Sequence, residues 1–219
     1  MIIHVTRHGQ VDQATDHPVG DPYLSEVGRE QARLLGVRLE ALGFSGSIHS
    51  SPYFRTVETA QIVAEVVDVD VIPAAEVREY VIREGQVDGF RGATAEDLSD
   101  RYSRVGGKVE LDYPWWTSEI ETHEDIEARV APLIDTVVAG KKDVLLVGHG
   151  ASVDGVHRTI LKKHAPEHLD HGRNGWNCVL SSFRFEPFEV INLLVTDHLP
   201  DDLVTSNAKS REEFLRESR

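Results

Sequence analysis

The chain has 219 residues, 40% of them hydrophobic and 27% charged, a balance typical of a soluble globular protein with room for one α/β domain. Its formal net charge of -14 argues against nucleic acid or an anionic membrane as the main partner, because both select basic surfaces. The single cysteine excludes an internal disulfide. The sequence shows no signal peptide and no apolar run of about 20 residues, so we expect a cytoplasmic protein.

Apolar runs and helical repeats alternate through the first third of the chain. The apolar run at residues 2–5 predicts a buried strand, and Ser25 is the expected N-cap of a helix that stops at Gly43. Three further elements are expected here: a strand over residues 44–50, a helix opened by Ser51 and Pro52, and a strand over residues 69–72. This alternation favours parallel strands joined by helices.

The regular pattern weakens between residues 73 and 121. This polar, glycine-bearing stretch contains one expected helix, around residues 95–102, and we interpret it as an insertion that acts as a lid or cap. Thr122 and Asp125 then predict the start of a helix that Pro132 should kink or split.

The last third of the chain contains the clearest buried strand, over residues 144–147, followed by a helix expected over residues 152–161. Two final strands, over residues 178–185 and 190–196, read as an antiparallel hairpin. We place a single domain over residues 1–204, with residues 73–121 as its lid-like insertion, and a C-terminal tail over residues 205–219. The expected fold is an α/β three-layer sandwich with a mostly parallel central sheet flanked by helices.

Two of the predicted strands end in a histidine flanked by glycine, in the segments Arg7-His8-Gly9 and Gly148-His149-Gly150. Ligands of open α/β sheets lie outside the carboxyl ends of the strands, so parallel neighbours would bring both histidines to one edge. One such histidine alone would more simply be a polar residue at a strand end, whereas the matched pair favours function. The glycines let the backbone approach a ligand and turn its N–H groups toward an anion.

Arg55 falls in the first turns of the helix expected after Pro52. Backbone amides and the helix dipole favour anions there, and a guanidinium can hold a phosphate through two parallel hydrogen bonds. For a lone arginine, a surface salt bridge with Glu58 or Glu26 is the alternative. Together with Arg7 and the two histidines, Arg55 indicates a site for an anionic ligand.

Three segments resemble those of the histidine phosphatase superfamily, also called phosphoglycerate mutase-like: TRHGQ, SPYFRTVETA and LLVGHGAS. The resemblance spans nearly the whole chain in the right order. It implies that His8 is the nucleophile, which attacks phosphorus and becomes a phosphohistidine. The other ring nitrogen of His8 should then be fixed by a hydrogen bond, which we expect to a backbone carbonyl. Arg7, Arg55 and His149 would surround the phosphoryl group and stabilise its charge, with no metal or cofactor required.

The resemblance also implies an acid that protonates the leaving oxygen, supplied from the loop after the third strand. We choose Glu79, because Arg78-Glu79 followed by the aromatic Tyr80 resembles the acid position of the family. Glu76 and Glu84 remain alternatives. Without the resemblance, each of these glutamates would be interpreted as solvated surface charge.

The segment after His8 indicates a branch of the family. Mutases carry an asparagine there that helps to hold phosphate, and it is missing from Gln10-Val11-Asp12-Gln13-Ala14. The segment instead resembles the branch of the suppressor-of-T-cell-receptor-signalling and ecdysteroid-phosphate phosphatases. This favours a phosphatase acting on a small or apolar phosphomonoester over a mutase. Aromatic residues that could form the wall for the leaving group, with core packing as the alternative, are Tyr80, Phe90, Trp115 and Trp116; Asp12 and Ser152 are further pocket candidates.

Other functions are less well supported by the sequence. His164, His168 and His171 do not complete a metal-binding motif, and we expect a solvated loop there. A catalytically quiet family member that acts as a binding module is disfavoured because all five expected catalytic positions are filled. A homodimer could form through the exposed sheet edge or the final hairpin.

Overall fold

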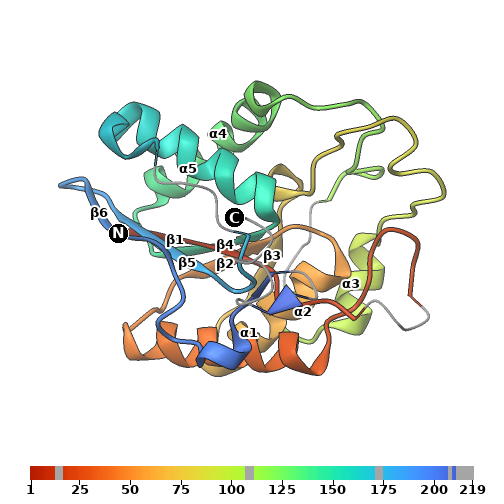
Figure 1. Cartoon of the computed structure of the whole chain (residues 1–219), viewed down its shortest axis with the longest axis horizontal. Coiled ribbons are helices and arrows are strands. Elements are labelled where there is room, and N and C mark those ends of the chain that lie inside the picture. Colours follow the sequence, from red (N-terminus) through yellow and green to blue (C-terminus); the bar gives the residue numbers. More distant parts are fainter. Residues whose placement is uncertain (13–16, 107–110, 171–174, 207–208, 211–219) are drawn as a thin grey trace.

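A six-stranded mixed sheet forms the middle layer of the molecule (Figure 1). The computed structural model describes residues 1–12, 17–106, 111–170, 175–206 and 209–210. The sheet has the order β3-β2-β4-β1-β5-β6, in which the first four strands are parallel and the last two antiparallel. Its strands are β1 (Ile2–Arg7), β2 (Ser47–Ser50), β3 (Val71–Pro73), β4 (Val144–Gly148), β5 (Leu180–Arg184) and β6 (Glu189–Val195).

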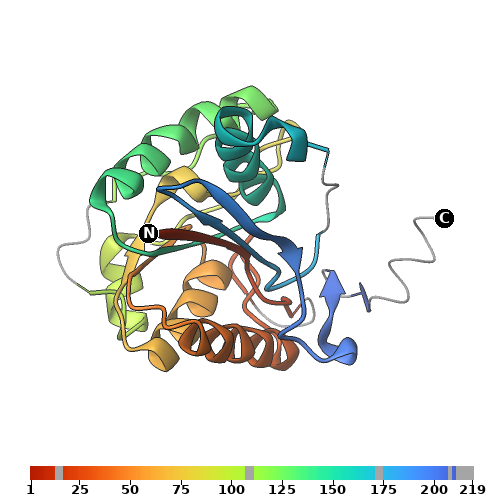
Figure 2. The ribbon, with the colours of Figure 1, turned by 90° about the vertical axis from the view of Figure 1, so that its left-hand side faces the viewer.

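Helices cover both faces of this sheet, as Figure 2 shows from the side. One face packs against the helix pair α1 and α2, and the other against α4 and α5. The predicted three-layer α/β sandwich with a mostly parallel central sheet is therefore confirmed. The helices are α1 (Glu26–Ala41), α2 (Phe54–Val67), α3 (Ala95–Arg101), α4 (His123–Gly140) and α5 (Gly150–His164).

Each face of the sheet has its own hydrophobic core, because successive side chains of a strand point to opposite faces. Leu145 and Val147 of β4 pack with the cluster under α1 and α2. Val144 and Leu146 of the same strand pack with the cluster under α4 and α5. A strand buried on both faces reads as a continuous apolar run, which explains why β4 was the clearest strand in the sequence.

Helix starts agree with the sequence where a cap was identified. The Ser25 side chain caps α1, and Thr122 forms a capping box with Asp125 at the start of α4. The prediction that Pro132 would kink or split its helix is wrong in its stronger form, because α4 runs unbroken through this residue. Helix α2 begins at Phe54, two residues after Pro52, and α5 extends beyond both expected ends.

Between β3 and α4, the described residues form α3 and a short 3-10 helix, η1 (Ala75–Val77), and otherwise have irregular backbone. At the end of the chain, η3 (Asp201–Leu203) is followed by a small hairpin of β7 (Thr205–Ser206) and β8 (Lys209–Ser210), which is separate from the main sheet. Residues 205 and 206, which we assigned to the tail, are buried. Packing of the domain therefore extends past residue 204, and residues 211–219 of the expected tail lie outside the described residues.

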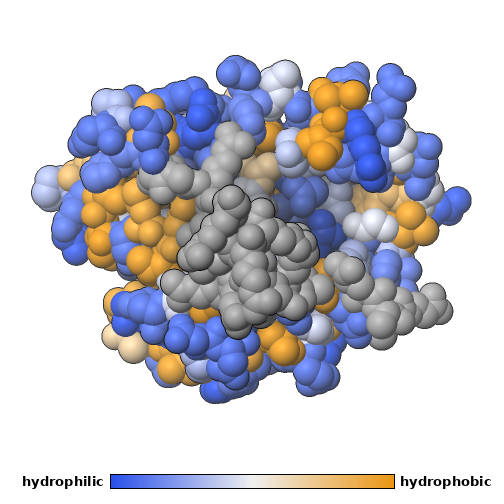
Figure 3. Space-filling view, viewed as in Figure 1, coloured by the Kyte–Doolittle hydropathy of each residue, from blue (hydrophilic) through white to orange (hydrophobic). Residues whose placement is uncertain are grey.

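Apolar side chains reach the surface in two areas of the view in Figure 3. One lies at the left, where Figure 1 places β5 and β6, and Ile191 of the edge strand β6 is 38% exposed. The other lies at the upper right, over the segment between β3 and α4, in which Ile82 and Ile120 are exposed. Across the described residues, no helix is long and apolar enough to cross a membrane.

Candidate active site

The two histidines predicted to share a sheet edge do so. Strands β1 and β4 are parallel neighbours, and Arg7 pairs in register with Gly148. The residue that follows each strand is a histidine. The centroids of the imidazole rings of His8 and His149 lie 5.3 Å apart. Both are buried, with 4% of His8 and none of His149 exposed. The register of two parallel strands thus assembles the centre of the site.

Two hydrogen bonds to backbone carbonyls hold His8, one through its own amide and one through its ring. Its amide donates to the carbonyl of Gly148 at 3.0 Å, and its Nδ1 lies 2.7 Å from the carbonyl oxygen of Gly9. A carbonyl only accepts, so Nδ1 carries the proton and Nε2 keeps its lone pair. Burial, together with the nearby charges of Arg7 and Arg55, holds the pKa of His8 well below its ordinary value. The ring is therefore neutral, as a nucleophile must be.

The glycine after His8 also makes a close backbone contact with α1. A Cβ on Gly9 would lie 2.5 Å from the carbonyl oxygen of Gly28 in α1, and a Cβ on Gly28 would lie 2.0 Å from the carbonyl oxygen of Gln10. Two backbones touch here, and only glycine permits that approach. The glycine in the motif thus lets the loop that carries His8 pack against α1. Gly150 has open space around it at the first position of α5.

Arg55 points inward rather than to the surface. Its guanidinium pairs with the buried carboxylate of Asp21 at 3.0 Å and donates from Nη2 to Nδ1 of His149 at 3.2 Å. The alternative surface salt bridge is wrong, because Glu58 and Glu26 both pair with Arg29. The Asp21 carboxylate also accepts the backbone amides of Phe54 and Arg55 at the start of α2. Asp21 thus holds the helix end and its arginine together.

Arg7 reaches the site from the end of β1, and its guanidinium donates to the carbonyl of Gly175. Burial lowers the pKa of Arg7, and the carboxylate of Glu79 acts in the opposite direction. The two arginines approach from different elements, β1 and α2, so positive charge lies on two sides of His8.

His149 lies between Arg55 and two serines. Its Nε2 is 2.9 Å from Oγ of Ser51, and its backbone amide donates to Oγ of Ser152 at 2.8 Å. Because the Arg55 guanidinium can only donate, Nδ1 accepts and Nε2 carries the proton. Burial, followed by the charge of Arg55, holds the pKa of His149 well below its ordinary value, so the ring is neutral.

Of the three candidate acids, the structure brings Glu79 to the histidines. Its Oε2 lies 3.4 Å from Nδ1 of His149 and 3.7 Å from Nη2 of Arg55. Since His149 is neutral, the first approach is not an ion pair. The Glu79 side chain is 27% exposed, which leaves room for exchange of a proton with a ligand or water. Glu84 is exposed, and Glu76 presents its backbone carbonyl to Arg129.

Aromatic rings line the side of the site near His149. The Tyr53 ring packs edge-on against His149 with centroids 4.9 Å apart and stacks on Phe90, with Trp115 also against it. Trp116 packs against this cluster. Tyr80 does not join it and packs instead with the core under α4 and α5. Tyr53 was not identified from the sequence, although it lies two residues before Arg55 in the motif that carries the resemblance.

Two other site candidates lie near the nucleophile loop. Ser152 contacts His149 as described above, whereas the backbone amide of Asp12 donates to the carbonyl of Tyr23 at 2.9 Å. The structure also shows polar residues at the site that were not identified from the sequence. Asn177 donates from its side chain to the carbonyl of His8 at 3.0 Å, and Thr59 accepts the amide of Gly9 at 3.0 Å. Thr59 lies in the SPYFRTVETA segment, whereas Asn177 lies outside the three segments that carry the resemblance and reaches the site through the fold.

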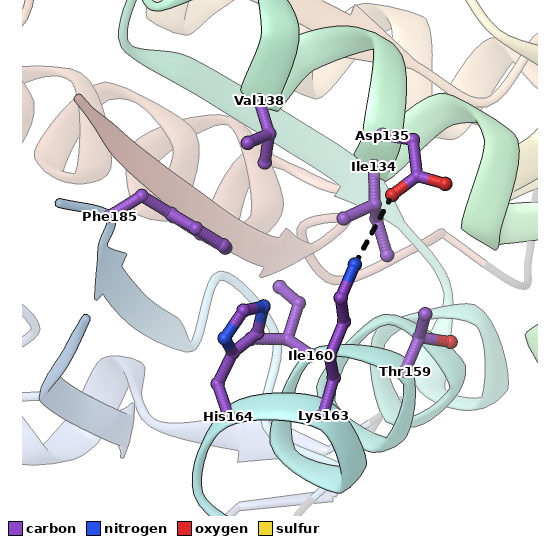
Figure 4. Close-up of a pocket in the computed structure, with 8 residues that line it drawn as sticks. All are labelled: Ile134, Asp135, Val138, Thr159, Ile160, Lys163, His164 and Phe185. Carbon is purple, nitrogen blue, oxygen red and sulfur yellow. Dashed lines mark ion pairs between the residues drawn. The ribbon is translucent and has the colours of Figure 1, made fainter. Parts of the chain in front are cut away.

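A second pocket lies at the other end of the sheet, between α4, α5 and the end of β5 (Figure 4). Its walls are largely apolar, and Lys163 pairs with Asp135 at 3.8 Å beside it. It shares no residue with the site around His8. Within the described part of the chain, no group of three or more His, Cys, Asp or Glu residues could hold a metal ion. His171 lies outside the described residues.

The fold and the paired histidines define a protein of the phosphoryl-transfer class built on an α/β sandwich. A model of the histidine phosphatase superfamily (branch 1) matches residues 3–197, and the chain belongs to this superfamily. A probable phosphoglycerate mutase GpmB of Salmonella arizonae is 28% identical over 165 residues, which cover 73% of this chain and 74% of that protein.

Two solved structures show the same fold. The ecdysone phosphate phosphatase of Bombix mori superposes with a TM-score of 0.70 at 16% identity, covering 98% of this chain and 99% of that one. A mycobacterial glucosyl-3-phosphoglycerate phosphatase superposes with a TM-score of 0.63 at 22% identity, covering 91% and 99%.

Proposed function

We propose that this protein is a phosphomonoesterase that uses His8 as its nucleophile and needs no metal ion or cofactor. The observation that carries the proposal is the state of His8. The ring is buried and neutral, and Nδ1 is tied to the Gly9 carbonyl, which leaves Nε2 with a free lone pair at the sheet edge. Arg7, Arg55 and His149 lie around it and supply the positive charge and hydrogen bonding that a transferring phosphoryl group requires.

The proposed reaction has two steps. In the first, the Nε2 lone pair attacks phosphorus, the bond to the leaving oxygen breaks, and Glu79 gives that oxygen its proton. In the second, water attacks the phosphohistidine, Glu79 takes the proton of the water, and the P–N bond breaks to return the lone pair to His8. Phosphate and an alcohol are the products, and the enzyme is restored. The place of Glu79 beside His149 and Arg55 supports this role over Glu76 and Glu84.

The proposed substrate is a small or apolar phosphomonoester. Tyr53, Phe90 and Trp115 form a cluster that reaches His149 through the Tyr53 ring, so an apolar leaving group would find aromatic surface beside the phosphoryl site. Gly9, Gly150 and Asp12 are kept as proposed substrate contacts. Tyr80 is a weaker proposal, because its ring packs with the other core.

A mutase is the second candidate, favoured by the 28% identity to the probable phosphoglycerate mutase. The missing asparagine after the nucleophile counts against it. Incubation with 3-phosphoglycerate separates the two functions: a phosphatase releases phosphate, whereas a mutase forms 2-phosphoglycerate.

Hydrolysis of p-nitrophenyl phosphate in the presence of a chelator tests the leading proposal. We expect activity in the wild type, and a loss on the order of 10³-fold or more in His8→Ala, because no other group replaces the nucleophile. Samples quenched in alkaline detergent should contain acid-labile phosphoprotein in the wild type only. His157→Ala, a change of a buried histidine outside the site, is the control and should keep the activity. Full activity in His8→Ala would contradict the proposal.

Location and assembly remain proposals as well. The net charge of -14 supports a cytoplasmic protein that binds neither nucleic acid nor anionic membranes. A homodimer would find an unpaired strand edge and half-buried apolar side chains at β6. Light scattering of the wild type and of Ile191→Lys tests that interface, and a monomer in both cases would contradict it.

A further inference from the structure

We propose that the C-terminal hairpin positions the nucleophile, and that Thr205 is the positioning residue through which it acts. This inference deepens the proposed function and rests on it, since it assumes that His8 is the nucleophile. Thr205 lies 197 positions from His8 along the chain, in the segment assigned to the tail from the sequence. In the fold it is buried, with 5% of its surface exposed.

A chain of buried side-chain hydrogen bonds connects Thr205 to the backbone on both sides of Gly9. The Thr205 hydroxyl donates to Oδ1 of Asn177 at 3.2 Å, and Nδ2 of Asn177 donates to the carbonyl of His8 at 3.0 Å. On the other side, the same hydroxyl accepts from Nε2 of Gln31 at 2.9 Å, and Oε1 of Gln31 accepts the amide of Gln10 at 2.8 Å. The loop that carries the nucleophile is thus held at two points that meet at one hydroxyl.

The chemistry of this arrangement requires a hydroxyl at position 205. Asn177 presents an acceptor to it and Gln31 presents a donor, so the group between them must both donate and accept. Asn177 and Gln31 are themselves fully buried, and a buried polar group without a partner is costly. The backbone strengthens the link, because the amide of Asn177 donates to the carbonyl of Thr205 at 2.9 Å.

The next residue of the hairpin acts on the arginine that precedes the nucleophile. Oγ of Ser206 donates to the carbonyl of Gly175 at 3.0 Å, and the same carbonyl accepts from the Arg7 guanidinium. Two adjacent hairpin residues therefore support two adjacent site residues, Thr205 supporting His8 and Ser206 supporting Arg7. Strand pairing within the main sheet holds the His8 amide, which donates to the Gly148 carbonyl, whereas the hairpin network holds the His8 carbonyl and the Gln10 amide.

The test compares Thr205→Val, which keeps the shape and removes the hydroxyl, with Thr205→Ser, which keeps the hydroxyl. We expect kcat for p-nitrophenyl phosphate to fall about tenfold in the valine variant with KM within twofold, because small displacements of a reacting group cost rate rather than binding. The serine variant should restore kcat to within about twofold of the wild type.

Ser182→Ala is the matched control. It removes another buried hydroxyl of the same domain, which lies 2.9 Å from Nδ1 of His4 in β1. This variant should lose stability to urea as Thr205→Val does, but keep kcat. An unchanged kcat in Thr205→Val, or an equal fall in Ser182→Ala, would overturn the inference.

Amide hydrogen exchange at Gly9 and Gln10 separates this inference from the proposed function. We expect faster exchange at both amides in Thr205→Val and wild-type exchange in Ser182→Ala. If the wild type hydrolyses no phosphomonoester, the proposed function fails and exchange alone decides the positioning role. Equal exchange in the two variants would then overturn it.

Discussion

The two sides of the candidate site are built in different ways. On one side, His8 and His149 follow directly from two paired strands, and both rings are buried. On the other side, Glu79 lies on irregular backbone between η1 and α3, and its side chain is 27% exposed. The His8 side therefore starts from paired strands of the sheet, whereas the Glu79 side starts from irregular backbone and depends on contacts that reach it from elsewhere.

Those contacts come mainly from Arg129 of α4. Its guanidinium donates to the carbonyls of Glu76 and Arg78, the latter at 3.0 Å, and to the carboxylate of Glu121 at 2.8 Å. Glu121 also pairs with Arg78 at 2.8 Å, so two positive groups share one buried carboxylate. A single helix side chain thus holds the backbone on both sides of Val77, just before Glu79. We therefore expect that Glu79 can be displaced without disturbing His8.

The largest expected effect is in Glu79→Gln, which removes the proton donor and keeps the side chain's size. With alkyl phosphates, whose leaving oxygen needs a proton, we expect kcat to fall about 10²–10⁴-fold. With p-nitrophenyl phosphate, whose phenolate leaves unprotonated, the first step should change far less. Measurements of the rate of the first step, made with each of the two substrates in turn, check this difference.

Glu84→Gln is the control, because it removes an exposed carboxylate from the same segment. This variant should keep the wild-type activity on both substrates. An equal loss in the rate of the first step on both substrates in Glu79→Gln would show that the carboxylate acts on the phosphoryl group itself. That result would contradict the separation of the site into a side around Glu79 that handles the proton and a side around His8 that handles the phosphoryl group.

The same difference explains how much of the molecule the sequence could predict. Strands, caps and paired histidines leave local patterns: the apolar run of β4, the Ser25 cap and the Gly148-His149-Gly150 segment were all identified correctly. The parallel pairing of the two histidine strands followed from general rules for α/β sheets. The sheet side of the site was therefore largely predictable.

The other contacts arise from tertiary packing, which leaves no local pattern. Asp21 lies in a polar loop and becomes important only because that loop meets the start of α2. Thr205 lies in a stretch that reads as a tail, and Asn177 precedes a strand without any periodic signal. Arg129 reads as one more charge on an amphipathic helix. Such residues are recognised only when their partners, distant in sequence, are known.

Acid should weaken the sheet side through His4, which lies in β1 four residues before His8. Burial lowers the pKa of His4 from 6.5 to about 4. Between these values the unfolded chain binds the proton more readily, so the free energy of unfolding decreases as the pH falls. The full contribution of His4 to the free energy of unfolding is present above pH 6.5. About 3 kcal/mol of it is lost by the time the pH has fallen to 4. His8 and His149 act in the same direction.

Urea unfolding at several pH values between 7 and 4 checks this expectation. The wild type should lose stability over this range by more than His4→Gln does, with a difference of up to about 3 kcal/mol. Parallel curves for the two proteins would mean that His4 does not titrate on unfolding. His123→Gln, a change of a more exposed histidine outside the sheet, should keep the wild-type dependence.

The smallest effect should come from the clamp on the acid loop. Arg129→Met removes the donors to both loop carbonyls and leaves Glu121 paired with Arg78 alone. We expect the rate of the first step to fall about tenfold for alkyl phosphates, with little change for p-nitrophenyl phosphate, because in that step a displaced acid matters only where the leaving oxygen needs a proton. The activity of Arg129→Lys on alkyl phosphates should lie between those of the wild type and Arg129→Met, since an ammonium cannot span three acceptors as a guanidinium does. Arg158→Met, which breaks the 2.7 Å contact from α5 to Glu127, is the matched control for losing a helix arginine. Equal losses of activity on the two substrates in both Arg129→Met and Arg158→Met would show that Arg129 supports the fold in general. The position of Glu79 would then not depend on Arg129 in particular.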